Sequence, residues 1–187
     1  KWPTSQCESV GGVYKNYLIM YGGLNLKLEN VYSTSRNDAW KYNLDTNVWT
    51  EIKYPANSKV PEGRFSHAGA IVDNELVVYG GRAMDHSTQK WYVLSDVWAL
   101  NLDTGAWREL ANMVQIPRSY HSMVYGPSHL SLKSGGSGGN GKDSNIWAFG
   151  GFRVVENSAG SERYYVFSDL LTRDFNSVDG KWYQFID

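Results

Sequence analysis

Short runs of about five apolar residues, separated by turn-forming residues, recur along the chain. Near the middle, residues 68–72 and 75–79 are two such runs, and the two residues between them suit a tight hairpin turn. Gly80 and Gly81 end the second run, and further runs follow at 97–100 and 106–110. The pattern predicts four short antiparallel strands here, and almost no helix.

The second strand of each group is apolar at consecutive positions rather than at alternate ones. This holds for residues 18–21, 76–79 and 146–149. A sheet with one solvated face alternates apolar and polar residues, so continuous apolar strands are covered on both faces. The sequence therefore predicts sheets stacked upon sheets.

The chain matches itself without a gap when it is shifted by 58 residues. The sequence Tyr-Gly-Gly at 21–23 falls on the same sequence at 79–81, and Asn-Leu-Asp-Thr at 43–46 falls on 101–104. A third copy has Phe-Gly-Gly at 149–151 and longer connections between its apolar segments. Length changes confined to connections indicate loops on a constant frame.

A double glycine, an Asp-x-Trp sequence or its aliphatic variant, and a closing tryptophan together resemble the kelch repeat. The landmarks are Gly22, Gly23, Trp40, Trp49, Gly80, Gly81, Trp98, Trp107, Gly150, Gly151 and Trp182. The first copy departs from the pattern at Gln6 and Ser9, where the others have arginine and histidine, and the third has Leu171 in place of tryptophan.

The resemblance implies an all-β fold of three four-stranded antiparallel blades, at approximately 1–54, 59–112 and 115–187, within one partial β-propeller. Because propellers hold about four to eight blades, three do not close a ring. We therefore expect further blades or another protein to complete the assembly, and the outer faces of the first and third blades to be apolar.

Charge and composition exclude several classes of protein. Lys and Arg number 18 and Asp and Glu 19, a balance that lacks the basic excess of a nucleic-acid binder. No apolar run approaches the ~20 residues that span a bilayer, so we expect no membrane insertion. The single cysteine and the absence of a glycosylation sequon favour a cytoplasmic location, with a cleaved targeting peptide as the open alternative.

Several motifs resemble catalytic or cofactor sites. The glycine-rich segment 134–142 satisfies G-x-x-x-x-G-K, but Asp143 replaces the Ser or Thr of a phosphate loop and a strand follows in place of a helix. We expect a flexible hairpin insertion, native or an engineered linker, and no cofactor. His67 and His121 are repeat-equivalent, so we expect buried, hydrogen-bonded histidines and neither a metal site nor a catalytic residue.

The loops remain as the candidate site. In kelch propellers that bind peptides, the segment after the double glycine and the segment before the first strand surround the channel mouth. Here these segments contain the candidate partner-binding residues Arg64, Phe65, Arg82, Arg118, Tyr120 and Arg153. Arginine suits carboxylate recognition because its planar fork binds bidentately.

We therefore expect a protein-interaction module or scaffold that binds an acidic segment of a partner at this mouth. For Arg64 and Arg118, structural bonds between blades are an equal alternative. A small-molecule enzyme on a kelch scaffold, of the oxidase or sugar-acid mutarotase type, is the alternative function, with its catalytic residues largely outside these blades.

Overall fold

A computed structural model of the chain describes residues 2–4, 6–25, 34–85, 87–88, 90–110, 116–127, 144–156, 162–174 and 182–185. In these ranges the regular secondary structure is β-strand throughout, and no helix long and apolar enough to cross a membrane occurs. The glycine-rich segment 134–142 lies outside the described residues, as do His86 and His129.

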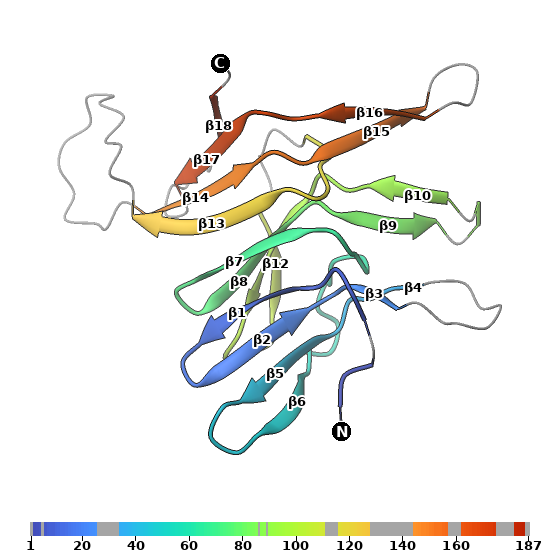
Figure 1. Ribbon diagram of the computed structural model, residues 1–187. Helices are drawn as coiled ribbons and strands as arrows, with labels where there is room; N and C mark the ends of the chain where they lie inside the picture. The colour runs from blue at the N-terminus through green and yellow to red at the C-terminus, as the bar shows by residue number, and fades with distance from the viewer. Residues whose placement is uncertain are drawn as a thin grey trace.

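Twelve of the strands form three four-stranded antiparallel sheets, here called blades 1, 2 and 3 (Figure 1). In blade 1 the order is β1 (Val10–Tyr14), β2 (Tyr17–Tyr21), β5 (Ala39–Asn43) and β6 (Val48–Ile52). Blade 2 consists of β7 (Ala68–Val72), β8 (Glu75–Tyr79), β11 (Val97–Asn101) and β12 (Trp107–Glu109). Blade 3 consists of β13 (Ser122–Pro127), β14 (Ser144–Phe149), β17 (Leu170–Asp174) and β18 (Trp182–Phe185). The all-β class and the three four-stranded antiparallel blades are thereby confirmed.

The first strands of the blades lie side by side, β1 against β7 and β7 against β13. Small residues allow this approach. A Cβ on Gly69 would lie 2.8 Å from a Val10 methyl group, and one on Gly12 would lie 2.7 Å from Ile71. Glycine at these positions therefore lets two strand backbones meet at the inner edge of the blades.

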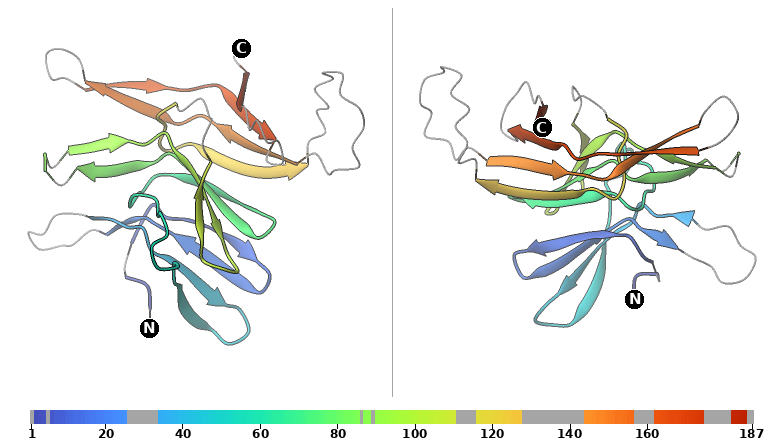
Figure 2. Two further views of the ribbon diagram at one scale, coloured as in Figure 1. Left: turned by 180° about the vertical axis from the view of Figure 1, so that it is seen from behind. Right: turned by 45° about the horizontal axis from the view of Figure 1, so that its top comes forward.

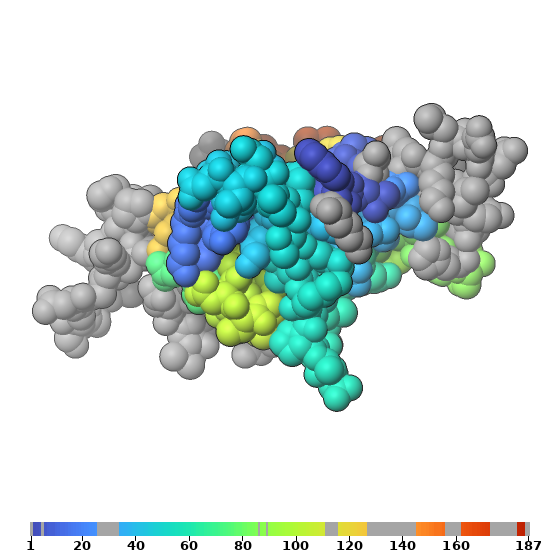
Figure 3. Space-filling view, turned by 90° about the horizontal axis from the view of Figure 1, so that it is seen from below, coloured from blue at the N-terminus to red at the C-terminus, as the bar shows by residue number. Residues whose placement is uncertain are grey.

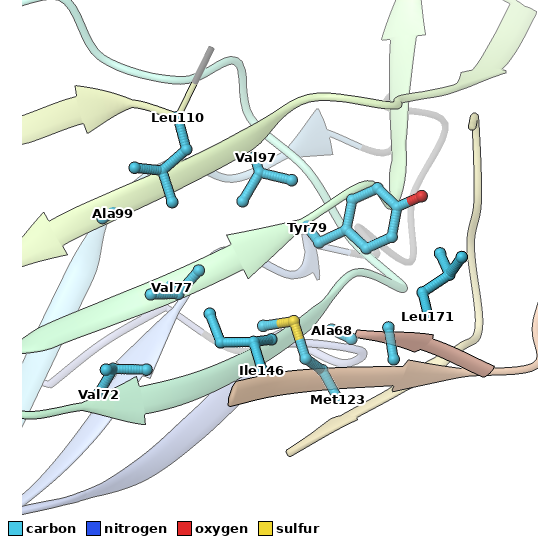
Figure 4. Close-up of a cluster of buried hydrophobic side chains, with 11 residues drawn as sticks. Ala68, Val72, Val77, Tyr79, Val97, Ala99, Leu110, Met123, Ile146 and Leu171 are labelled. Carbon is cyan, nitrogen blue, oxygen red and sulfur yellow. The ribbon is translucent and has the colours of Figure 1, made fainter. Parts of the chain in front are cut away.

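Two apolar cores fill the spaces between blades, and β8 contributes to both. Leu76 and Val78 pack toward blade 1, whereas Val77 and Tyr79 pack toward blade 3, and all four are buried. Figure 4 shows the core between blades 2 and 3, with side chains of blade 2 facing Met123 of blade 3. The expected cover on both faces of the second strand is thus present in the middle blade.

The outer strands of blade 2 also reach blade 1. The ring of Trp107 lies 4.9 Å from that of Tyr21, and a Cβ on Gly105 would meet the Lys53 carbonyl oxygen. Figure 3 shows this contact from below, where the yellow-green end of blade 2 lies against the cyan strands of blade 1. Aromatic rings therefore fill the wedge between these two blades.

The second strands of the terminal blades are covered on one face only. Phe149 of β14 is 56% exposed, although its repeat equivalents Tyr21 and Tyr79 are 0% and 2% exposed. On blade 1, Leu18 of β2 is also exposed. Each terminal blade thus presents apolar side chains on its outward face.

The connections after the double glycines, expected as loops, contain three two-stranded ribbons. These are β3 (Leu24–Asn25) with β4 (Thr34–Ser35), β9 (Arg82–Asp85) with β10 (Lys90–Val93), and β15 (Phe152–Glu156) with β16 (Glu162–Val166). Positive φ angles at both glycines of each pair bend the chain, so the hairpin continues beyond the blade in a new direction. The ribbons project from one side of the molecule (Figures 1 and 2).

Candidate functional site

The segment before each first strand lies against the segment after the double glycine. Phe65 and Arg82 exchange backbone hydrogen bonds of 3.0 and 2.8 Å, and Ser119 and Phe152 exchange two of 2.9 Å. Cys7 and Leu24 make the equivalent pair in blade 1. The segment before each first strand and the segment after each double glycine therefore meet at the base of the ribbons. We call the surface around the pairs Phe65–Arg82 and Ser119–Phe152 the ribbon face.

Arg64 and Arg118 lie beneath this surface rather than on it. Each side chain is 0% exposed and forms a bidentate ion pair with the aspartate of its own blade. Arg64 donates to the two Asp96 oxygens at 2.8 and 2.9 Å and to the Gly80 carbonyl at 3.0 Å. Arg118 makes the same bonds to Asp169 and Gly150.

The aspartates in these pairs stay ionised. Burial raises the pKa of Asp96, and the hydrogen bonds and charge of Arg64 outweigh that effect, so the net pKa is below the usual value. The pKa of Asp169 is lowered by Arg118 in the same way. Each buried arginine thus neutralises its aspartate and links it to the first glycine of the double glycine in the same blade.

The expectation that Arg64 and Arg118 touch a partner is corrected by this burial. Their guanidinium groups offer no accessible donor. Both side chains make structural bonds, but within their own blades rather than between blades. The sequence signal was present, because repeat equivalence of a charged residue is typical of a structural bond. Phe65 is likewise only 3% exposed, so it supports the ribbon face from below.

Arg82 does lie at the ribbon face, between aromatic rings of two blades. Its guanidinium carbon is 5.9 Å from the Phe65 ring centre and 6.0 Å from that of Phe152. Trp91 meets the Phe65 ring edge-on at 4.8 Å. Within the part of the chain that the structure describes, Arg82 has no ion-pair partner and its Nε has no hydrogen-bond partner.

Exposed aromatic rings continue the surface toward blade 3. Tyr120, which is 50% exposed, stacks on Phe152 at 5.2 Å with an interplanar angle of 13°. The exposed ring of Tyr164 meets Phe152 edge-on at 5.4 Å. Arg82 is therefore the cation of a surface built mainly from rings, which favour a guanidinium by cation–π attraction.

Arg153 points away from this cluster. Phe152 is the residue equivalent to Arg82, because each directly follows the double glycine, and these two side chains lie together. Arg153 is the next residue of β15, so its side chain leaves the opposite face of the ribbon. There it lies over the Tyr165 ring at 5.1 Å. A shift of one residue along a strand therefore prevents the expected convergence of arginines at one mouth.

His67 and His121 are buried between blades, as expected, but neither ring nitrogen has a hydrogen-bond partner within the described residues. Each ring instead meets a tyrosine of the preceding blade, Tyr21 at 5.4 Å and Tyr79 at 4.7 Å. Burial lowers the pKa of His121 to about 3, and burial together with the Arg64 charge lowers that of His67 well below its usual value. Both histidines are neutral packing groups.

Two tryptophans of the repeat bond to the same set of aspartates. Trp40 and Trp98 donate to Asp38 and Asp96, each at 2.6 Å. The side chain of Trp182 lies outside what the structure describes. Across the described ranges, no three His, Cys, Asp or Glu side chains are grouped so that they could hold a metal ion.

Sequence reasoning missed Trp91, Phe152 and Tyr164 as members of the ribbon face. They lie in connections that were expected to be irregular. The repeat alignment could have identified Phe152, because it occupies the position equivalent to Arg82 directly after the double glycine.

Comparison with known proteins gives a consistent family. The profile of the KLHDC2/KLHL20/DRC7 Kelch-repeats domain matches residues 2–136. The chain is 30% identical over 166 residues to bovine Kelch domain-containing protein 2, covering 79% of this chain and 39% of that protein. It is also 30% identical over 104 residues to human Kelch domain-containing protein 10, covering 54% of this chain and 22% of the relative.

Fission-yeast protein ral2 shows the same identity over 104 residues, which are 54% of this chain and 16% of that protein. The chain thus spans well under half the length of these relatives. Among solved structures, that titled "Structure of YjhT" superposes with a TM-score of 0.65 at 17% identity, covering 97% of this chain and 52% of that one. At this identity the likeness concerns the fold.

Proposed function

Because the chain belongs to the KLHDC2/KLHL20/DRC7 Kelch-repeats domain family, we propose that it is a protein-interaction module. Its ribbon face binds a partner segment that contains a carboxylate. The single observation that supports this most strongly is Arg82, whose half-buried side chain lies between two rings and has no counter-ion in the described chain.

The surroundings of Arg82 suit such a contact. Its position is fixed on both sides by Phe65 and Phe152, so little side-chain freedom is lost when a ligand binds. Tyr120 and Tyr164 add exposed aromatic area beside it. Arginine and tyrosine surrounded by apolar area are the residue types that contribute most to protein–protein affinity.

A second kind of contact is proposed for the terminal blades. Phe149 and Leu18 are exposed at positions that the middle blade covers completely. Further blades, or another protein, would cover these faces and complete the propeller.

The experiment for the ribbon face uses a blocked peptide with alternating glutamate and tyrosine, and its glutamine counterpart. A charge-assisted hydrogen bond contributes about 1.5–3 kcal/mol, so Arg82→Ala should weaken binding of the glutamate peptide roughly tenfold or more. Arg153→Ala is the matched control, because this arginine leaves the other face of its ribbon. Equal binding of the two peptides, or unchanged affinity in Arg82→Ala, would contradict the proposal.

A further inference from the structure

A groove separates the ribbon β9–β10 from the ribbon β15–β16. It has a volume of about 450 Å³, within the range of ligand-binding clefts. Four consecutive residues of β10 line it, Lys90 to Val93. Successive side chains of a strand point to opposite faces, so a groove that touches all four runs along the edge of β10 rather than over one face.

Among the described residues, no strand pairs with the backbone on this edge of β10. The Leu94 N–H donates to the Gly81 carbonyl, and this bond determines which residues of β10 form hydrogen bonds with β9. Alternate residues therefore direct their backbone groups to β9, and Trp91 and Val93 direct theirs to the other side.

The opposite wall has the same character. The Phe167 N–H donates to the Gly151 carbonyl, so the backbone groups of Phe152 and Val154 point away from β16. Those of Phe152 bond to Ser119. Val154 is the next residue with this orientation, and it lines the groove across from β10.

The side chains divide the groove into an apolar part and a charged end. Trp91, Val93, Pro117 and Val154 supply apolar surface, and the charged residues are Asp85, Glu162 and Lys90. Two carboxylates and one ammonium group leave a net charge of −1. Hydrogen bonds from Ser87 lower the pKa of Asp85 to about 2, so its carboxylate is ionised at neutral pH.

We propose that this groove binds an extended peptide segment of a partner protein, which adds a strand to the free edge of β10. The segment places apolar side chains against Trp91 and Val154 and a basic side chain between Asp85 and Glu162. Unpaired strand edges are established templates for such strand addition. The site differs from the Arg82 contact in its chemistry, and among the residues that line the groove it shares Trp91 with the ribbon face. It therefore goes beyond the function proposed above.

The test uses an eight-residue peptide of alternating valine and arginine, acetylated and amidated so that it carries no carboxylate for Arg82. We expect it to bind the chain and to slow hydrogen exchange at the Trp91 and Val93 amides at least tenfold at saturation. Val93→Pro removes one edge donor that has no partner among the described residues, and should weaken binding at least fivefold. Glu162→Lys should do the same through charge.

Two controls keep the outcomes separate. Glu109→Lys on β12, outside the groove, and Arg82→Ala should each change the affinity less than twofold. Absence of binding at millimolar peptide, or binding without protection of the two amides, would overturn the proposal. If Val93→Pro does not fold, the exchange measurement on the unmodified chain decides. Equal affinity for a valine–glutamate peptide would overturn the assignment of a basic side chain.

Discussion

Arg36 forms a bidentate pair with Asp38, at 2.9 and 3.0 Å, and so replaces in blade 1 the arginine that precedes the first strand in blades 2 and 3. Blade 1 has Gln6 at that position. The replacement comes from the segment after the ribbon, only two residues before the aspartate. The aspartate therefore has a guanidinium partner in all three blades, although the sequence supplies it from two different places.

The two kinds of pair should differ in their contribution to stability. Arg118→Ala leaves Asp169, whose side chain is 5% exposed, without its cation, and should cost about 3–5 kcal/mol. Arg36 is 33% exposed, so water screens its pair with Asp38, and Arg36→Ala should cost only about 1 kcal/mol. Urea unfolding of the two variants measures the difference, and equal losses would show that burial does not set the strength of these pairs.

The same aspartates predict a loss of stability in acid. Asp96 and Asp169 have lowered pKa values in the folded protein, so their contribution is present above the unfolded pKa of about 3.9 and is lost as the pH falls through the folded value. This window lies below pH 4. It is therefore distinct from the effect of the histidines, which begins at higher pH.

His121 should make the protein less stable as the pH falls below about 6.5. Its folded pKa is about 3, so the unfolded chain binds a proton that the folded chain excludes. Stability from a neutral buried histidine is present above the unfolded pKa of about 6.5 and declines below it, by about 2 kcal/mol at pH 5. Unfolding curves between pH 5 and 8 measure this slope.

Phenylalanine provides the matched variant, because both nitrogens of His121 lack hydrogen-bond partners in the described chain. His121→Phe should reduce the loss between pH 8 and pH 5 by about 2 kcal/mol. An unchanged pH dependence in this variant would mean that His121 is protonated in the folded protein, contrary to its buried position beside Tyr79.

Gly81→Ala should destabilise the protein strongly, because Gly81 has a φ of 95° and an added Cβ would lie 2.6 Å from the His67 Cβ and 2.8 Å from the Phe65 carbonyl oxygen. We expect a loss of about 3 kcal/mol or more from backbone strain and overpacking together. Gly126→Ala is the control, since nothing lies within 4 Å of its added Cβ. Similar unfolding midpoints for the two variants would refute the role of the double glycine as a close-packed bend.

The blade strands were predictable because the apolar pattern and the repeat spacing reflect where the backbone forms strands and where it turns. The strands at 68–72 and 75–79 are found with those bounds, since a two-residue turn and a double glycine delimit them on both sides. The ribbons were not predictable as strands, because they are short and their pairing depends on how the glycines redirect the chain. Side-chain direction was the weakest inference. Arg82 is the first residue after its double glycine and Arg153 is the second after its own, so the two side chains leave opposite faces of their ribbons.

Phe149 and Tyr79 should respond very differently to substitution, although they are repeat-equivalent. Tyr79 is covered by His121 and donates to the Ile116 carbonyl at 2.7 Å, so Tyr79→Ser should cost about 3–5 kcal/mol, as large aromatic truncations in a core do. Phe149 is 56% exposed, so Phe149→Ser should cost less than about 1 kcal/mol. Urea unfolding of the two variants measures this contrast.

Exposure of Phe149 also predicts association of the chain through its uncovered blade faces. Large apolar patches are rare on stable monomers, so at micromolar concentration we expect sedimentation faster than a monomer of 21.1 kDa. Phe149→Ser should shift the distribution toward the monomer, whereas Val48→Ser, which removes an exposed apolar side chain from β6 at the outer edge of blade 1, should leave it unchanged. A cooperatively melting monomer at all concentrations would contradict the view that the outward faces of the terminal blades are contact surfaces.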